Sequence, residues 1–163
     1  MKKRILSLVL ALACMCSLSA CGGDKAPAGY DTGALKLMSE KGAFSEELEP
    51  LEGDIVFALY GLADYGLTLE FLTDAASIRS TGSTCEEASV LVWKTEEQAV
   101  LAKQALQDYL QSQIDTNQNY RPAEIPKLEN AKLSQLGNTV LLAVANDYSA
   151  AEAAVPYLNT AKN

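Results

Sequence analysis

The stretch that decides the fold is CEEASVLVWKTEEQAVLAKQALQDYLQSQI, residues 85–114. In the part from Glu86 to Trp93, apolar residues occupy every second position, which is the spacing of one face of a β-strand. Thr95-Glu96-Glu97-Gln98 is then a capping box, whose Thr and Gln side chains satisfy the first amides of a helix. Behind this box, apolar residues recur every three or four positions. The stretch therefore predicts a strand followed directly by an amphipathic helix of about twenty residues.

Two pairs of strands flank this helix in the sequence. Leu67 to Leu72 alternates in polarity and is separated from the strand 86–93 by the polar turn 80–84, so we expect an antiparallel hairpin. After the helix, the segments 130–136 and 139–145 flank Gly137-Asn138, a pair of residues that favours a tight turn. The second pair of strands therefore predicts a second hairpin.

Shorter helices are expected at both ends of these hairpins. Leu51 to Tyr60 has apolar residues at helical spacing between Pro50 and a Gly stop at position 61. Ser149-Ala150-Ala151-Glu152 is a second capping box, and Pro156 should end the helix that it opens. The polar segment 115–126 is expected to be a loop. The order predicts an α+β fold, a two-layer sandwich with an antiparallel sheet of about four strands (a ββαββα core) and an additional N-terminal helix.

The first twenty residues resemble a bacterial lipoprotein signal peptide. A basic start, Met1-Lys2-Lys3-Arg4, precedes an apolar run that is too short to span a bilayer as a helix. Leu18-Ser19-Ala20-Cys21 resembles the lipobox, the signal-peptidase recognition sequence, which implies cleavage before Cys21 and its acylation with diacylglycerol and palmitate-like chains. We expect a signal peptide at 1–20, a lipidated Cys and flexible tether at 21–43, and one domain at 44–163. The alternative is a plain secretory signal with a chance Cys.

Removal of this leader would change the charge and the cysteine count. The formal net charge of −8 would become −11 over 143 residues, because the leader carries three basic residues and no acid. Nucleic acid and anionic headgroups bind clustered Lys and Arg, so neither is expected as a partner. A cationic ligand or a basic protein suits the charge better, although the charge could serve solubility alone. Only Cys85 would remain as a free thiol, and the adjacent Glu86 and Glu87 disfavour its thiolate.

The residue types that are missing exclude several classes of site. The chain has no His, which excludes Ser-His and Cys-His dyads and His-ligated metals. The Asp residues lack the spacing of a calcium loop, and no glycine-rich phosphate loop is present. We therefore predict no catalytic residues, no metal site and no cofactor.

Several local patterns occur together in one order. They are Leu59-Tyr60-Gly61, Cys85-Glu86-Glu87-Ala88 before Val90-Leu91-Val92, the helix after Thr95, Tyr120-Arg121-Pro122-Ala123-Glu124, Lys127-Leu128-Glu129-Asn130-Ala131, and Gly137-Asn138 before Val140. Over about residues 44–158 they resemble lipoproteins of the domain of unknown function 4358 family, found mainly in Gram-positive anaerobes. The resemblance implies location and domain identity. That family offers no activity or catalytic residue to carry over.

The candidate contact residues lie on the sheet and in the polar segment after the long helix. If Ala88, Val90, Val92, Val140, Leu142 and Val144 face the helices, the other face carries Leu91 and the only Trp, Trp93. We expect that face either to be covered by the helix at 51–59 or to dock a partner. Glu86 and Glu87 could meet an Arg or a ligand cation, or simply be solvated. Arg121, with Tyr120, could clamp an anion or fix the loop.

These observations predict a membrane-anchored extracytoplasmic lipoprotein, held on the outer face of the cell membrane by its lipid. The expected role is a non-catalytic module that binds a small ligand or another envelope protein. One alternative is a cell-envelope enzyme that uses only carboxylates, Lys or Tyr, which would need two acids within about 10 Å, one with a raised pKa. A second alternative is a purely structural envelope protein.

Overall fold

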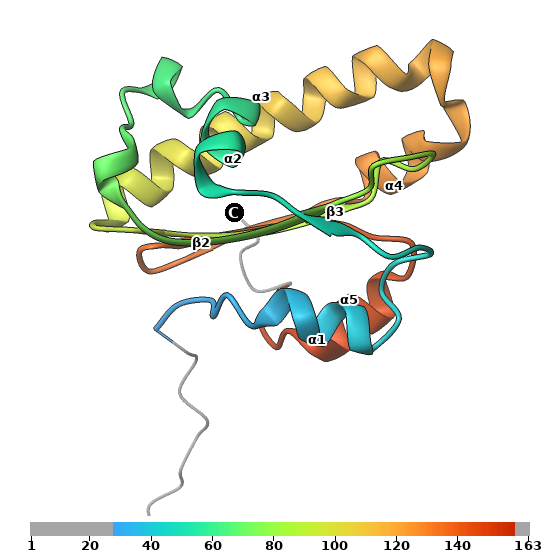
Figure 1. Cartoon of the computed structure of the whole chain (residues 1–163), viewed down its shortest axis with the longest axis horizontal. Coiled ribbons are helices and arrows are strands. Elements are labelled where there is room, and N and C mark those ends of the chain that lie inside the picture. Colours follow the sequence, from blue (N-terminus) through green and yellow to red (C-terminus); the bar gives the residue numbers. More distant parts are fainter. Residues whose placement is uncertain (1–27, 159–163) are drawn as a thin grey trace, which may run out of the picture.

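The structure is a computed structural model that describes residues 28–158. Its centre is a five-stranded antiparallel sheet with the strand order β1-β2-β3-β5-β4 (Figure 1). The strands are β1 (Glu49–Pro50), β2 (Leu72–Arg79), β3 (Glu87–Trp93), β4 (Lys132–Leu136) and β5 (Thr139–Val144). The α+β class is therefore confirmed, and the two-residue β1 adds a fifth strand at the edge beside β2.

Helices cover both faces of this sheet. On one face lie α2 (Gly53–Leu59) and α3 (Glu96–Tyr120), with α4 (Ile125–Glu129) packed against α3. The other face is covered by α1 (Ala34–Glu40) and α5 (Tyr148–Ala154) (Figure 1). Two helical layers enclose the sheet because β3 and β5 are apolar at nearly every position, and an apolar face on each side needs cover. The predicted two-layer sandwich was wrong in this respect.

The elements set by local signals are where the sequence predicts them. The capping box of Thr95 and Gln98 is formed, and α3 runs for 25 residues behind it. The β4–β5 hairpin turns at Gly137, whose φ of +54° favours glycine. A Cβ at Gly137 would also collide with the carbonyl oxygen of Ala28, and the amide of Tyr30 donates to Thr139 Oγ1 at 2.8 Å. The first described residues are thereby fixed beside this turn.

Three boundaries differ from the expectation. The predicted strand at 67–72 contains a 3-10 turn at Leu69–Phe71, and β2 begins only at Leu72, with small residues at its centre. The predicted loop at 115–126 is largely helical, since α3 continues to Tyr120 and a 3-10 turn leads into α4. Gln and Asn side chains support that extension through i, i+4 hydrogen bonds, such as Asn117 to the Gln113 carbonyl. α5 is capped by Asp147 rather than Ser149, and it ends before Pro156.

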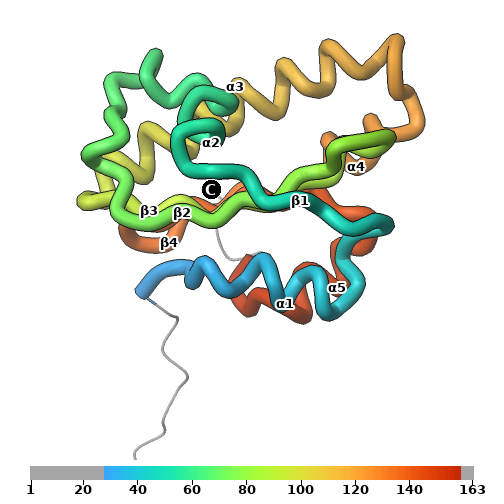
Figure 2. Tube along the Cα trace, in the orientation of Figure 1, coloured from blue at the N-terminus to red at the C-terminus, as the bar shows by residue number. Residues whose placement is uncertain are grey.

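The domain also begins earlier than expected. The interval 21–43, expected as a tether, includes α1, whose Met38 is fully buried against the sheet. Residues 28–43 therefore belong to the folded domain and contribute Tyr30, Leu35 and Met38 to its core. Figure 2 shows α1 beside α5 under the sheet, with β1 at the near edge.

The residues of β3 and β5 that share a face of the sheet differ from the expectation. In the β3–β5 ladder Leu91 lies opposite Val140, and Val90 lies opposite Leu141. Residues opposite each other share a face, so Leu91 and Trp93 point toward α3 together with alternate residues of β5. The predicted grouping of Val90 with Val140 was wrong by one position. The Trp93 face is covered, and the covering helices are α2 and α3 together.

Candidate functional site

Two neighbouring carboxylates organise the end of the sheet where β3 begins. Glu87 is 1% exposed and lies between β2, the end of α2 and α3. Its Oε2 accepts hydrogen bonds from Tyr109 Oη at 3.1 Å and Tyr60 Oη at 3.4 Å, and the Nε of Arg79 is 3.7 Å away. Burial raises the pKa of Glu87 to about 7, against the opposing effects of Arg79 and the two hydroxyls. The carboxyl therefore titrates near neutral pH.

A chain of hydroxyl groups leads away from this carboxyl toward the sheet edge. Tyr60 Oη is 2.6 Å from Ser89 Oγ, and Ser89 Oγ is 2.7 Å from Ser77 Oγ on β2. The rings of Tyr60 and Tyr109 meet edge to face with centroids 4.8 Å apart. Burial, followed by the charge of Glu87, raises the pKa of both tyrosines, so they remain hydroxyl donors. The network thus connects Glu87 to a residue on the edge of the sheet.

Glu86 has different partners, although it is the adjacent residue. Its Oε1 is 2.7 Å from Lys127 Nζ, and its two oxygens accept the amide and the hydroxyl of Ser45 at 2.7 and 2.5 Å. Lys127 also pairs with Glu124 at 3.1 Å, and Glu124 accepts the amide of Cys85 at 2.8 Å. Burial opposes the charge of Lys127, but hydrogen bonds to Glu86 and Glu124 raise its pKa. This cluster joins the segment after α1, the β2–β3 turn and α4.

An open groove lies along the outer edge of β2. It has a volume of about 370 Å³, and α1, β1 and β2 form its walls. Its lining includes Leu35 of α1, Leu51 beside β1, and Ala76 and Ile78 of β2, so the groove is mainly apolar. The sequence did not reveal this groove, because neither α1 nor β1 was predicted. Ser77, the last member of the hydroxyl chain, lies on the same edge.

A family model matches residues 62–145, just over half of the chain, and is described as a domain of unknown function (DUF4358). The chain belongs to this family. The DUF4358 match contains β2, β3, α3, α4, β4 and β5, and with them Glu86, Glu87 and Tyr109. Tyr60, Ser45 and α1 lie outside the matched residues, so both carboxylates take some of their partners from there. No curated protein and no solved structure matches the chain.

Three of the expected contact residues of this DUF4358 domain are buried, namely Leu91, Trp93 and Glu87. Leu91 and Trp93 are fully buried under the helices, which excludes them as partner contacts in this structure. The indole Nε1 of Trp93 is a buried donor without a hydrogen-bond partner. Glu87 is also enclosed, and the structure does not bring it together with Arg121. The interpretation that both carboxyls are simply solvated was wrong, because both are buried and paired.

The polar segment after α3 has a structural role at one position. Arg121 Nη1 donates to the carbonyl of Thr84 at 3.1 Å, which fixes the β2–β3 turn, whereas Tyr120 is 83% exposed. Burial raises the pKa of Cys85, and Glu124 and Glu87 add to this increase while Arg121 opposes it. The predicted direction for this thiol is correct, although burial rather than the glutamates is the main cause.

Residues 28–158 lack two further features. No group of three or more Cys, Asp or Glu in this part of the chain has the arrangement of a metal site. None of its helices has the length and apolar character needed to cross a bilayer. The predicted lipidation residue Cys21 and the recognition residues Leu18, Ser19 and Ala20 lie outside the described residues.

Proposed function

We propose that this protein is a lipid-anchored, extracytoplasmic binding module without catalytic activity. The proposed anchor rests on the sequence alone: a basic start, an apolar run and Leu18-Ser19-Ala20-Cys21. Two or three acyl chains on one residue would hold a protein stably at a bilayer, whereas one chain gives marginal binding. The location would then be the outer face of the cell membrane.

The binding role rests on one observation, the open groove along β2. Ligand sites are typically concave and mainly apolar, with a few polar groups that fix orientation. The groove has this character, since apolar residues of three elements meet the polar edge of a strand. A purely structural envelope protein would not need such a groove, so this observation favours binding.

Fatty-acid labelling tests the anchor. Cells that express the parent chain are expected to incorporate labelled palmitate into it, and Cys21→Ser should abolish the label and release the chain from the membrane fraction. Cys85→Ser is the matched control, because it removes a different thiol and should leave the label unchanged. Equal labelling of the parent and Cys21→Ser would overturn the proposed anchor.

A carboxylate-dependent enzyme is the second candidate, and Glu87 is the observation that favours it. A pKa of about 7 suits a general acid or base at neutral pH. However, the carboxyl is enclosed by Tyr60, Tyr109 and Arg79, and no substrate could reach it without opening the core. A water-soluble carbodiimide tests access. We expect exposed Glu49 to react and Glu87 to be protected, and modification of Glu87 in the folded protein would favour the enzyme.

A further inference from the structure

The outer edge of β2 is open over most of its length. β1 pairs only with Arg79 and Ile78, and one more bond follows, from the amide of Leu51 to the carbonyl of Ser77 at 2.9 Å. The chain then leaves the edge to form α2. In an antiparallel strand, each residue directs both its amide and its carbonyl to one side, and the next residue directs both to the other side. Ala75 is two residues from Ser77, so its amide and carbonyl point outward like those of Ser77. Among the described residues no strand pairs with this edge at Ala75.

The open edge and the groove together form the position of a missing strand. A segment placed there would continue the line of β1 and could bond to the outward amide and carbonyl of Ala75. Its alternate side chains would enter the groove, whose apolar wall includes Leu35, Ala76 and Ile78. Peptides recognised by strand addition gain affinity from the main chain and specificity from such side-chain pockets. The groove therefore suits an extended peptide better than a compact ligand.

The edge is shielded by its own acid in the free protein. Asp74 Oδ1 accepts the amide of Ala75 at 2.9 Å, and its Oδ2 accepts the hydroxyl of Thr32 at 3.3 Å. Charged side chains on an open strand limit unspecific pairing with other chains. An incoming segment must displace this carboxylate before it can bond to the amide of Ala75. Asp74 therefore limits pairing with unspecific strands.

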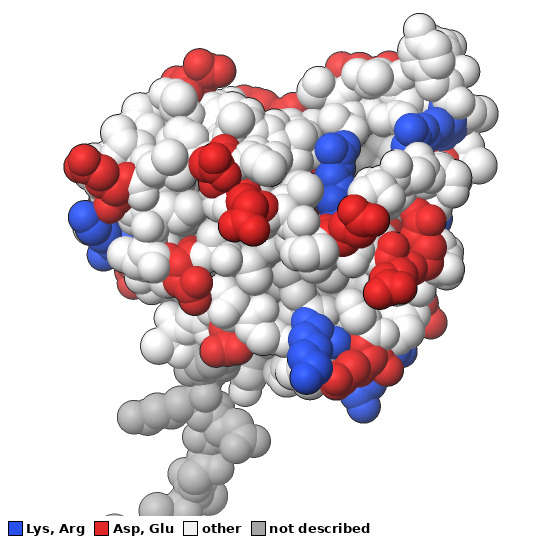
Figure 3. All heavy atoms as spheres, in the orientation of Figure 1, with Lys and Arg blue, Asp and Glu red and all other residues white. Residues whose placement is uncertain are grey.

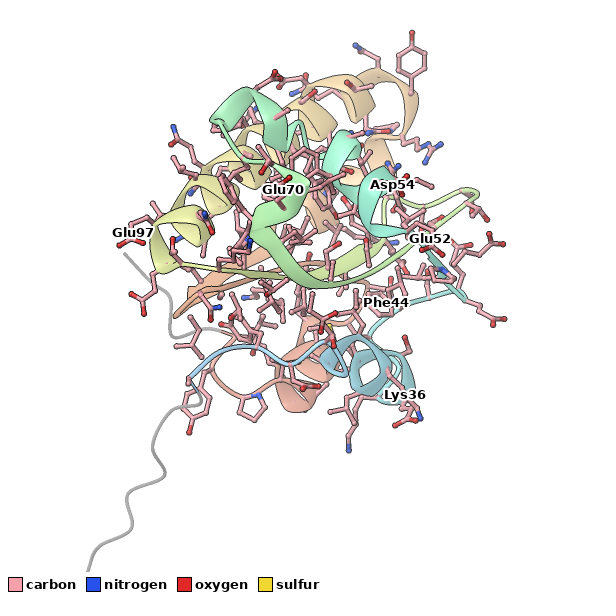
Figure 4. All side chains as sticks on the ribbon, turned by 60° about the vertical axis from the view of Figure 1, so that its left-hand side comes forward. Lys36, Phe44, Glu52, Asp54, Glu70 and Glu97 are labelled. Carbon is pink, nitrogen blue, oxygen red and sulfur yellow. The ribbon has the colours of Figure 1, made fainter. Side chains whose placement is uncertain are left out.

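Acidic residues lie next to the groove on both of the walls that strands form, at β1 and at β2. Exposed Glu49 lies between the lining residues Leu48 and Pro50, Glu52 follows Leu51, and Asp74 precedes Ala75. The charged residue in the lining itself is Lys36 of α1, which pairs with Glu40 at 3.7 Å. In Figure 3 acidic groups outnumber basic groups on the face that shows this edge, and in Figure 4 Glu52 lies above the edge and Lys36 lies on α1 below it. A second copy of this chain would bring the same acids against these, and like charges across an interface disfavour pairing.

From this geometry we infer that the groove binds an extended, basic segment of a partner protein, which adds to the sheet as a strand beside β2. The segment alternates apolar side chains, which enter the groove, with Lys or Arg on its opposite face, which lies on the side of Glu49 and Glu52. The inference deepens the proposed binding function and rests on it.

Fluorescence anisotropy with the full-length chain in detergent tests the inference. The probe is a labelled acetyl-Lys-Val-Lys-Val-Lys-Val peptide, compared with its Glu-Val counterpart and with a version N-methylated at alternate residues. The Lys-Val peptide is expected to bind at least about tenfold more tightly than either comparison peptide, since one loses the charge match and the other loses the main-chain bonds. Equal binding of the N-methylated peptide would overturn strand addition.

Variants of the chain locate the binding. Ala75→Pro removes one outward amide without removing a bond to β3, so it should weaken Lys-Val binding at least about tenfold. If Ala75→Pro does not fold, as judged by its circular dichroism, the pair E49Q/E52Q decides. That pair should weaken binding about fivefold, while E97Q/E129Q, with the same change in net charge, should leave it unchanged. Equal effects of the two pairs would overturn the inference.

The remaining outcomes separate this inference from the proposed function. A parent dimer that Ala75→Pro converts to a monomer would assign the edge to a second copy and overturn the basic partner. No Lys-Val binding together with normal Cys21 labelling would overturn the peptide inference and leave the anchored module in place. Specific Lys-Val binding without Cys21 labelling would overturn the anchor and support the groove.

Discussion

Glu86 and Glu87 are adjacent in the sequence, yet their side chains have entirely different partners. Glu86 contacts an ammonium group, Lys127 Nζ, at 2.7 Å, together with an amide and a hydroxyl from Ser45. Glu87 has two hydroxyl donors within the core under α3, and a partly exposed arginine lies 3.7 Å away. Successive side chains along a strand point to opposite faces of the sheet and so contact different helices. Residue type alone therefore does not decide the chemistry of either carboxyl.

The difference concerns how each carboxyl is compensated for burial. A buried charge needs a counter-charge and hydrogen bonds, and otherwise the group becomes neutral. Glu86 and Glu124 share Lys127 and form a compact ion cluster. Glu87 has hydrogen bonds but a more distant counter-charge, and its raised pKa follows. The first carboxyl joins distant segments of chain, and the second makes the core sensitive to pH.

The largest expected effect comes from removing the cation of the Glu86 cluster. Lys127→Met leaves Glu86 and Glu124 buried without their counter-charge, so we expect a loss of about 3 kcal/mol or more in the free energy of unfolding. Urea unfolding followed by Trp93 fluorescence measures this loss. Lys132→Met is the control, since its ion pair with Glu152 is more exposed and should contribute less than about 1 kcal/mol. Similar losses in both variants would contradict the distinct role of the cluster.

The next effect is the pH dependence that Glu87 causes. Its pKa rises from 4.5 to about 7 on folding, so the native state binds this proton more tightly than the unfolded chain. The stability from Glu87 is complete below pH 4.5 and is lost as the pH rises through 7. Glu87→Gln stays neutral, so the difference between parent and variant should change by about 3 kcal/mol over this interval. The measurement is the urea midpoint at a series of pH values.

A difference between parent and Glu87→Gln that is constant with pH would show that this carboxyl does not titrate in that interval. The Lys127→Met variant sharpens the contrast, because Glu87→Gln should change the pH dependence of this variant by as much as it changes that of the parent. The two carboxyls would then act independently, as expected for sites with different partners.

The smallest effect is expected at Arg121. Its side chain makes one hydrogen bond to the Thr84 carbonyl at the edge of the Glu86 cluster. Arg121→Ala should therefore cost less than about 1 kcal/mol, measured by the same urea unfolding. A loss as large as that of Lys127→Met would mean that the β2–β3 turn, rather than the Lys127 ion cluster, supports Glu86.

The parts of the fold that could be predicted are those decided by neighbours along the chain. The capping box at Thr95 and the turn at Gly137 each specify a conformation within a few residues, and the structure has both. β2 was predicted too early, because the alternation at 67–72 is stronger than that of the small residues that form the strand. β1 is only two residues long, and α1 falls in an interval that the sequence assigned to a tether.

The face of Trp93 depended on contacts between distant segments. β3 and β5 are adjacent in the sheet, but α3, α4 and β4 separate them along the chain. No turn between them sets the register, and a shift of one residue moves every side chain to the opposite face. The environment of Glu87 was hidden for the same reason, because Tyr60 and Tyr109 come from elements 27 and 22 residues away. The motif around the pair was recognisable, whereas its partners were not.

The contact of Tyr30 with Thr139 has a consequence for the orientation of the domain at the membrane. An acyl anchor at Cys21 would lie seven residues before Ala28 along the chain, and a chain of that length reaches at most about 25 Å. The domain would then be attached to the membrane at the end that carries the β4–β5 turn. The end with Glu86 would point away from the membrane, because Glu87 pairs with Val144 at one end of the β3–β5 ladder and Thr139 lies at the other end. The flank formed by β2 would stand roughly upright between them. A longer connection to the anchor would increase the distance from the membrane at which a partner can reach β2. It would not change which side of the sheet is accessible.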